Sequence, residues 1–249
     1  MAHQIYSAPE DVLIYAVGDV HGQLHLLDDI LSQIVIDADK TSDVTKRFLV
    51  FVGDYIDRGP DSAGVIERLV SGLPDGFEAH CLMGNHEAIL LDFLDDPTLL
   101  PHWLRNGAAA TLASYGVGAP GEDAPLPAFI QCRDQLFAAL PLSHLAFLRG
   151  LPLSVKLGDY YFVHAGIRPG VPLDAQARND ALWIRDDFLD RDEDFGCIVV
   201  HGHTPGPEPV ERRNRIGIDT GAWVYGRLTA LRLAGSERAF FHAEEAGAD

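Results

Sequence analysis

Five short polar segments of this chain combine residue types that bind metal ions. They are Gly-Asp-Val-His-Gly at 18–22, Gly-Asp-Tyr-Ile-Asp-Arg-Gly at 53–59, Gly-Asn-His-Glu at 84–87, His-Ala-Gly at 164–166 and His-Gly-His-Thr-Pro at 201–205. Each follows an apolar run that is typical of a buried strand. Carboxylates, imidazoles and amide oxygens are ligands of divalent ions. Together the segments indicate a two-metal site that hydrolyses phosphoesters.

Six side chains in these segments are the candidate metal ligands. In chain order they are Asp19, His21, Asp54, Asn85, His164 and His203. We expect the first three to bind one ion and the last four to bind a second, so that Asp54 bridges the pair. A carboxylate has two oxygens and can span two cations about 3.5–4 Å apart. A set without thiolates suits manganese best, with iron or zinc as alternatives, and its histidines disfavour magnesium.

The same segments contain candidates for the remaining steps of hydrolysis. Water bound to the metal ions ionises near neutral pH and would be the nucleophile. Arg58 and Arg185 are the candidates for phosphate binding, because guanidinium offers a planar fork to phosphate oxygens. A leaving alkoxide needs a proton, and His86 oriented by Asp57 would be its general acid. We expect His201 to pack at a strand end or to support a ligand rather than to bind metal.

Strand and helix patterns alternate in the first half of the chain. Apolar runs at 12–17, 48–52 and 78–83 precede helical patterns at 24–34, 65–70 and 88–94, which predicts βαβ units and a largely parallel sheet. Further strands are predicted at 160–163, 197–200, 215–218, 228–233 and 238–242, with a hairpin at 234–236. The polar segments all begin where a strand ends, which is the edge at which α/β sheets bind ligands.

The strand pattern lapses between about residues 92 and 150. Prolines interrupt this stretch, which otherwise has helical patterns at 103–115 and 129–140. We interpret it as a helical cap inserted over the site, within a single domain that spans residues 1–249.

The composition is that of an ordinary globular protein, with 47% hydrophobic and 22% charged residues. A net charge of −18 argues against a nucleic-acid partner and against an anionic membrane surface. No apolar run approaches the roughly 20 residues that span a bilayer. The three cysteines form no Cys-x-x-Cys pair, and the N-terminus lacks the pattern of a secretory signal. These features predict a cytoplasmic protein.

The five segments resemble the motifs of the phosphoprotein phosphatases, a branch of the calcineurin-like metallophosphoesterase superfamily. The resemblance covers about residues 12–90 and 160–225 and includes small bacterial and phage members. It implies an α/β fold, a metallophosphoesterase-type β-sandwich flanked by helices, with a dinuclear and often manganese-containing centre. Position by position it implies the same six metal ligands, phosphate binding by Arg58 and by Arg185 of Leu-Trp-Ile-Arg at 182–185, and proton donation by His86 with Asp57.

Three positions distinguish branches of this superfamily. Pro205 stands where metallophosphodiesterases often have a further histidine ligand, and Asp57 and Glu87 differ from the usual residues of symmetrical dinucleoside tetraphosphate hydrolases. The cap, however, resembles those hydrolases at Trp103, Asn106, Gly107, Thr111, Leu112, Ser114 and Tyr115. We therefore expect a serine/threonine protein phosphatase acting on phosphorylated proteins or small phosphoesters. The alternatives are a symmetrical dinucleoside tetraphosphate hydrolase and a catalytically silent metal-binding scaffold.

Overall fold

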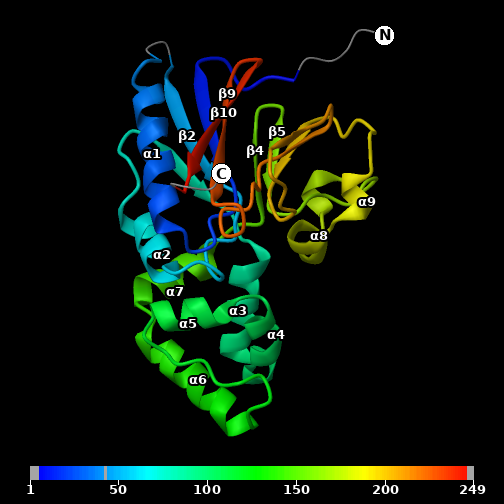
Figure 1. Cartoon of the computed structure of the whole chain (residues 1–249). Helices are drawn as coiled ribbons and strands as arrows, with labels where there is room; N and C mark the ends of the chain where they lie inside the picture. Colours follow the sequence, from blue (N-terminus) through cyan, green and yellow to red (C-terminus); the bar gives the residue numbers. More distant parts are fainter. Residues whose placement is uncertain (1–5, 42–43, 246–249) are drawn as a thin grey trace.

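The computed structural model describes residues 6–41 and 44–245 (Figure 1). Two five-stranded sheets pack face to face, with strand orders β10-β9-β1-β2-β3 and β4-β5-β6-β8-β7. Both sheets are mixed, because three adjacent strands in each are parallel and the remaining strands pair antiparallel with their neighbours. The predicted β-sandwich is thus confirmed, while the expectation of a largely parallel sheet holds only for three adjacent strands of each sheet.

The first sheet contains β1 (Val12–Val17), β2 (Lys46–Phe51), β3 (Glu78–Cys81), β9 (Arg227–Ala234) and β10 (Glu237–Glu244). Strands β1, β2 and β3 are the parallel units expected from the alternating pattern. Strands β9 and β10 form the predicted hairpin around residues 235–236, and β9 pairs antiparallel with β1. A two-residue turn permits only antiparallel pairing, so this hairpin makes the sheet mixed.

The second sheet contains β4 (Ser154–Leu157), β5 (Tyr160–Val163), β6 (Ile198–His201), β7 (Val210–Glu211) and β8 (Arg215–Gly217). Strands β5, β6 and β8 are parallel, and β4 and β7 pair antiparallel at the two edges. The sequence did not predict β4 or β7. Both are short edge strands without a fully buried residue, so neither carries the apolar pattern by which strands are recognised.

Alternating side chains of β1 show how the sandwich is built. Leu13, Tyr15 and Val17 belong to the core beneath the helices, and Ile14 and Ala16 belong to the core between the sheets. Successive residues of a strand point to opposite faces, and both faces of this strand are covered. That arrangement explains why the run 12–17 is apolar at every position.

Helices cover the outer face of each sheet (Figure 1). The first sheet is covered by α1 (Leu24–Ala38), with α2 (Ser62–Ser71) and α3 (Asn85–Asp95) in the same hydrophobic core. The second sheet is covered by α8 (Arg178–Trp183) and α9 (Asp186–Leu189), which follow the short 3-10 helix η2 (Leu173–Ala175). Within the described ranges, none of the helices combines the length and apolar character needed to cross a membrane.

The stretch between α3 and β4 is helical, as predicted, and gathers at one end of the sandwich (Figure 1). It contains η1 (Pro97–Leu99), α4 (Leu100–Arg105), α5 (Ala108–Ser114), α6 (Leu126–Ala139) and α7 (Leu142–Gly150). The helical pattern at 103–115 divides into α4 and α5 because Gly107 takes a left-handed conformation, with φ +101°. The cap helices share one continuous core with α1, α2 and α3, which supports the single-domain interpretation, still a prediction.

Candidate active site

The five polar segments converge where the parallel strands of the two sheets end. The segments at 18–22, 53–59 and 84–87 follow β1, β2 and β3, and those at 164–166 and 201–205 follow β5 and β6. All six predicted metal ligands are buried, and side chains from the two sheets touch there. Burying so many carboxylates and imidazoles is unfavourable unless they are paired or bind a cation.

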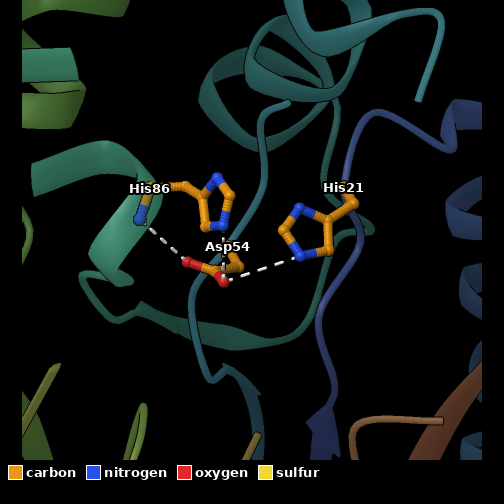
Figure 2. A group of neighbouring side chains, drawn as sticks. All are labelled: His21, Asp54 and His86. Carbon is orange, nitrogen blue, oxygen red and sulfur yellow. Dashed lines mark hydrogen bonds and ion pairs between the residues drawn. The ribbon is translucent and has the colours of Figure 1, made fainter. Parts of the chain in front are cut away.

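Asp54 lies at the centre of this cluster (Figure 2). Its Oδ2 atom is 3.6 Å from Nε2 of His21, 3.7 Å from Nε2 of His86 and 3.5 Å from Nε2 of His164. The cluster contains two triads, His21–Asp54–His86 and Asp54–His164–His203. Within each triad, the ligand atoms all lie within 4.8 Å of one another. Asp54 is the member common to both, which is the position expected of a bridging ligand.

The second triad presents lone pairs that face one another. Nδ1 of His164 lies 3.0 Å from the carbonyl oxygen of Val52, which can only accept, so Nδ1 carries the proton and Nε2 is a bare acceptor. That Nε2 atom lies 2.8 Å from Oδ1 of Asn85 and 3.2 Å from Nδ1 of His203. Nε2 of His164 and Oδ1 of Asn85 are thus two acceptors without a proton between them, an arrangement that a divalent ion would stabilise.

His21 is held in the same tautomer. Its Nδ1 atom lies 2.8 Å from the carbonyl oxygen of Ile56, so its Nε2 is unprotonated. This Nε2 is directed toward Asp54 and accepts from Nη1 of Arg58. Two further site atoms, Oδ1 of Asp19 and Nε2 of His203, are buried without a hydrogen-bond partner among the described residues. A metal ion at each position would satisfy these atoms, since a buried polar atom otherwise costs free energy.

Asp19, an expected ligand of the first ion, is buried in the same cluster but belongs to neither triad. Its Oδ2 atom accepts the backbone N–H of His203 at 3.0 Å, and the triad around His21 contains His86 instead of Asp19. Burial, together with the carboxylates of Asp219 and Asp54, raises the pKa of Asp19 well above its ordinary value. A cation beside these carboxylates would reverse that shift.

Asp219 is a buried acid of the site that the sequence analysis did not assign. It follows β8, and burial raises its pKa to about 6. The sequence contains a pattern that could have identified Asp219, because Ile-Asp-Thr-Gly at 218–221 begins at a strand end like the five assigned segments.

His86 and Asp57 form the expected pair. Nδ1 of His86 lies 2.7 Å from Oδ2 of Asp57, and both side chains are buried. Burial lowers the pKa of His86, but the charge of Asp54 and the hydrogen bond to Asp57 outweigh it, so that the net pKa is raised. A raised pKa favours the protonated imidazole, the form that proton donation requires.

The two candidate phosphate-binding arginines are placed differently. Nη1 of Arg58 lies 3.0 Å from Nε2 of His21, so this guanidinium is inside the site. Arg185 is exposed, and its Nη1 donates to the hydroxyl of Thr204 at 3.2 Å. The charge of Arg185 still adds to burial in lowering the pKa of His164, which places it at the rim.

Glu87 has a structural task that the sequence did not reveal. Its carboxylate accepts the backbone N–H groups of Gly84 at 2.9 Å, Asp54 at 3.0 Å, Tyr55 at 2.8 Å and Ile56 at 3.3 Å. It therefore ties the loop after β2 to the start of α3, and so fixes Asp54 relative to the residues at 85–86.

Strained backbone conformations are concentrated at the site. Six non-glycine residues of the described chain have left-handed φ values, and five of them are His21, Asp54, Asp57, Arg58 and His203. Such conformations cost about 1–3 kcal/mol each and persist only where surrounding contacts enforce them. These backbone conformations lower the stability of the folded protein, and they direct the five side chains into the site.

His201 lies behind the cluster rather than in it. It is buried, its Nδ1 lies 3.1 Å from the carbonyl oxygen of Gly202, and its Nε2 lies 3.5 Å from Nη1 of Arg215. It belongs to neither triad, which agrees with the expected packing at the end of β6.

Similar curated proteins come from bacteria. An asymmetrical bis(5'-nucleosyl)-tetraphosphatase PrpE of Bacillus mycoides (strain KBAB4) is 27% identical over 87% of this chain and 88% of its own length. The protein of the same name from Anoxybacillus flavithermus (strain DSM 21510 / WK1) is 28% identical with the same coverage.

Solved structures share the fold at lower identity. A structure provisionally assigned as a diadenosine tetraphosphatase superposes with a TM-score of 0.65 at 22% identity, over 94% of this chain and 95% of the other. A protein serine/threonine phosphatase of Saccharomyces cerevisiae superposes with a TM-score of 0.53 at 16% identity, over 95% of this chain and 81% of the other.

The family model described as calcineurin-like phosphoesterase matches residues 12–233, which include both sheets' central strands and all five polar segments. This confirms the superfamily that the motifs indicated. The chain belongs to the calcineurin-like phosphoesterase family.

Proposed function

We propose that this phosphoesterase cleaves dinucleoside tetraphosphates asymmetrically, with two divalent metal ions in the buried cluster. The observation that carries the proposal is the similarity to the PrpE proteins, which extends over 87% of the chain. It favours the nucleotide alternative over the serine/threonine phosphatase that the motifs led us to expect. The names of these relatives also specify asymmetrical rather than symmetrical cleavage. Manganese is the proposed metal, and the cytoplasmic location stays a prediction.

Each side chain of the cluster has a proposed part in the reaction. Asp54 would bridge the ions, with Asp19 and His21 on one side and Asn85, His164 and His203 on the other. When bound, two divalent ions supply an ionised water molecule and neutralise phosphate charge. Arg58 would bind a phosphate oxygen, with Arg185 closing the rim. His86 would donate the proton on Nε2 to the leaving oxygen while Asp57 holds Nδ1.

One observation supports a second candidate, a phosphomonoesterase acting on phosphoserine or phosphothreonine. The buried His86–Asp57 pair is suited to protonating a poor leaving group such as a serine alkoxide. A nucleotide leaves as a phosphate anion, a far better leaving group, and depends less on such an acid. The two candidates therefore differ in how strongly turnover should depend on His86.

The test compares three substrates with the manganese-loaded protein: diadenosine tetraphosphate, a phosphoserine peptide and p-nitrophenyl phosphate. We expect the highest kcat/KM for diadenosine tetraphosphate, and ATP and AMP as products. Two molecules of ADP would indicate symmetrical cleavage, and a preference for the peptide would support the phosphomonoesterase. No turnover with manganese, iron or zinc would support the scaffold alternative.

The variant His86→Asn separates catalysis from metal binding. It should retain bound metal and slow hydrolysis of the peptide more than hydrolysis of p-nitrophenyl phosphate, whose leaving group needs no proton. His102→Asn, which changes an exposed histidine of the cap, is the matched control. Equal slowing of both substrates by His86→Asn would count against its role as the acid.

A further inference from the structure

One corner of the cap touches the loop that carries the proton-donating pair and the phosphate-binding arginine. This α4–α5 corner runs from Trp103 to Thr111 and lies against Asp57 and Arg58. The polar segments assigned from the sequence do not include it. Its contacts explain how Asp57 and Arg58 are held in place, which the five segments alone do not.

The carboxylate of Asp57 is held from two sides. Oδ2 accepts the indole N–H of Trp103 at 2.8 Å, beside its contact with His86, and Oδ1 accepts the hydroxyl of Thr111 at 2.5 Å. Asp57 is fully buried, so these groups replace water as its hydrogen-bond donors. Neutral donors on both oxygens leave the carboxylate a single orientation, with Oδ2 directed at the imidazole.

The backbone of Asp57 depends on the same corner. Its N–H group donates to Oγ1 of Thr111 at 2.9 Å and to Oγ of Ser62 at 3.0 Å. Asp57 has a left-handed φ of +71°, which costs free energy that local contacts must offset. The hydroxyl of Thr111 therefore both accepts from the main chain and donates to the side chain of one residue.

Arg58 is fixed by the bend between α4 and α5. Its N–H group donates to the carbonyl oxygen of Gly107 at 3.2 Å. A Cβ atom at Gly107 would lie 2.9 Å from the backbone nitrogen of Arg58, and Gly107 itself has a left-handed φ. Only glycine permits both this conformation and this approach.

We propose that the α4–α5 corner positions the proton donor and the phosphate-binding arginine as one unit. Trp103 and Thr111 are positioning residues, which act through Asp57 and touch no reacting atom. The proposal rests on the proposed role of His86 as general acid, so its effect on turnover should be largest for a substrate whose leaving group needs a proton. The cap is then a part of the catalytic machinery rather than only a cover.

The test uses Trp103→Phe and Thr111→Val, alone and combined with Asp57→Asn. Each single variant should lower kcat for a phosphoserine peptide by about tenfold, the value of one hydrogen bond to a charged group, and lower kcat for p-nitrophenyl phosphate much less. Metal content should be unchanged. In the Asp57→Asn background neither substitution should lower kcat further, because the group through which it acts is already disabled.

Ser114→Ala is the matched control. It removes a hydroxyl of α5 that accepts the N–H of Ala63 and donates to the carbonyl oxygen of Thr111. This hydroxyl contacts neither Asp57 nor the hydroxyl of Thr111, so kcat of the variant should equal that of the wild type. Equal losses for both substrates, or a further loss in the Asp57→Asn background, would show that Trp103 and Thr111 only stabilise the fold. If Asp57→Asn itself leaves turnover of the peptide unchanged, the proposed acid is wrong, and that result is distinct from failure of the positioning proposal.

Discussion

The guanidinium of Arg58 lies over the indole ring of Trp223, with 4.7 Å between Cζ and the ring centroid. The same guanidinium is 3.0 Å from His21 in the metal-binding cluster, so it joins the buried site to an aromatic residue that is 42% exposed. A phosphate on Arg58 would therefore lie next to an accessible indole. A dinucleoside tetraphosphate has a base that can stack there, and a phosphoserine peptide has none.

Replacing Trp223 should separate base recognition from phosphate recognition. Stacking of one base on an aromatic side chain contributes about 1–3 kcal/mol, so Trp223→Leu should raise KM for diadenosine tetraphosphate by about tenfold or more. Trp223→Phe, which keeps an aromatic face, should stay near the wild-type KM. Inorganic tetraphosphate, which has no base, is the control substrate. A parallel rise in KM for both substrates would mean that Trp223 serves only to hold Arg58.

Metal binding should stabilise the folded protein through Asp54. The unprotonated Nε2 atoms of His21 and His164 face Asp54, so manganese should bind the folded state and raise Tm. At a concentration of 100 Kd the gain is about 2.7 kcal/mol for one site. Asp54→Asn should remove most of this rise in thermal scans, and Asp92→Asn, an exposed carboxylate of α3, should retain it. If manganese raises the Tm of the Asp54→Asn variant as much as that of the wild type, Asp54 is not a ligand.

Glu87→Gln should destabilise the protein although it changes few atoms. Each carboxylate oxygen of Glu87 accepts two backbone N–H groups, so an amide NH2 in place of either oxygen leaves two buried donors without an acceptor. The expected loss in the free energy of unfolding is about 3 kcal/mol, measured by urea titration. Glu10→Gln, at an exposed position, should change stability little. A loss as small as that of the control would mean that the loop after β2 is held without Glu87.

The strands and ligands that have a recognisable local residue pattern could be predicted from the sequence. The runs 12–17 and 160–163 correspond to β1 and β5 because strands buried on both faces are apolar throughout. The candidate ligands were identifiable because metal chemistry restricts residue types and because each follows such a strand. Edge strands β4 and β7 lack this pattern and were missed.

Contacts between distant residues were not predictable from the sequence. Nothing local shows that Trp103 donates to Asp57, that Glu87 gathers four N–H groups, or that Asp219 is buried near Asp19. Each contact depends on how separate elements pack. A tryptophan or a glutamate in a helix has the same local sequence pattern whether or not it makes such a contact. The division of α4 from α5 does have a local signal, since Gly107 follows Asn106, but helical spacing at 103–115 conceals it.

The last prediction concerns pH. Burial lowers the pKa of His201 from 6.5 to about 3. The unfolded chain therefore binds a proton at this histidine between these values while the folded protein does not, so the contribution of His201 to stability is present above pH 6.5 and is lost as pH falls.

His201→Gln removes this titration. The free energy of unfolding of metal-free wild-type protein should fall more steeply from pH 6.5 toward pH 4 than that of the variant, by about 1.4 kcal/mol per pH unit. Urea titrations at several pH values measure this difference, and the other buried histidines and acids contribute equally to both proteins. His102→Gln, at an exposed site, should keep the wild-type slope. Identical slopes for wild type and His201→Gln would mean that His201 accepts its proton in the folded protein, through a rearrangement at the end of β6.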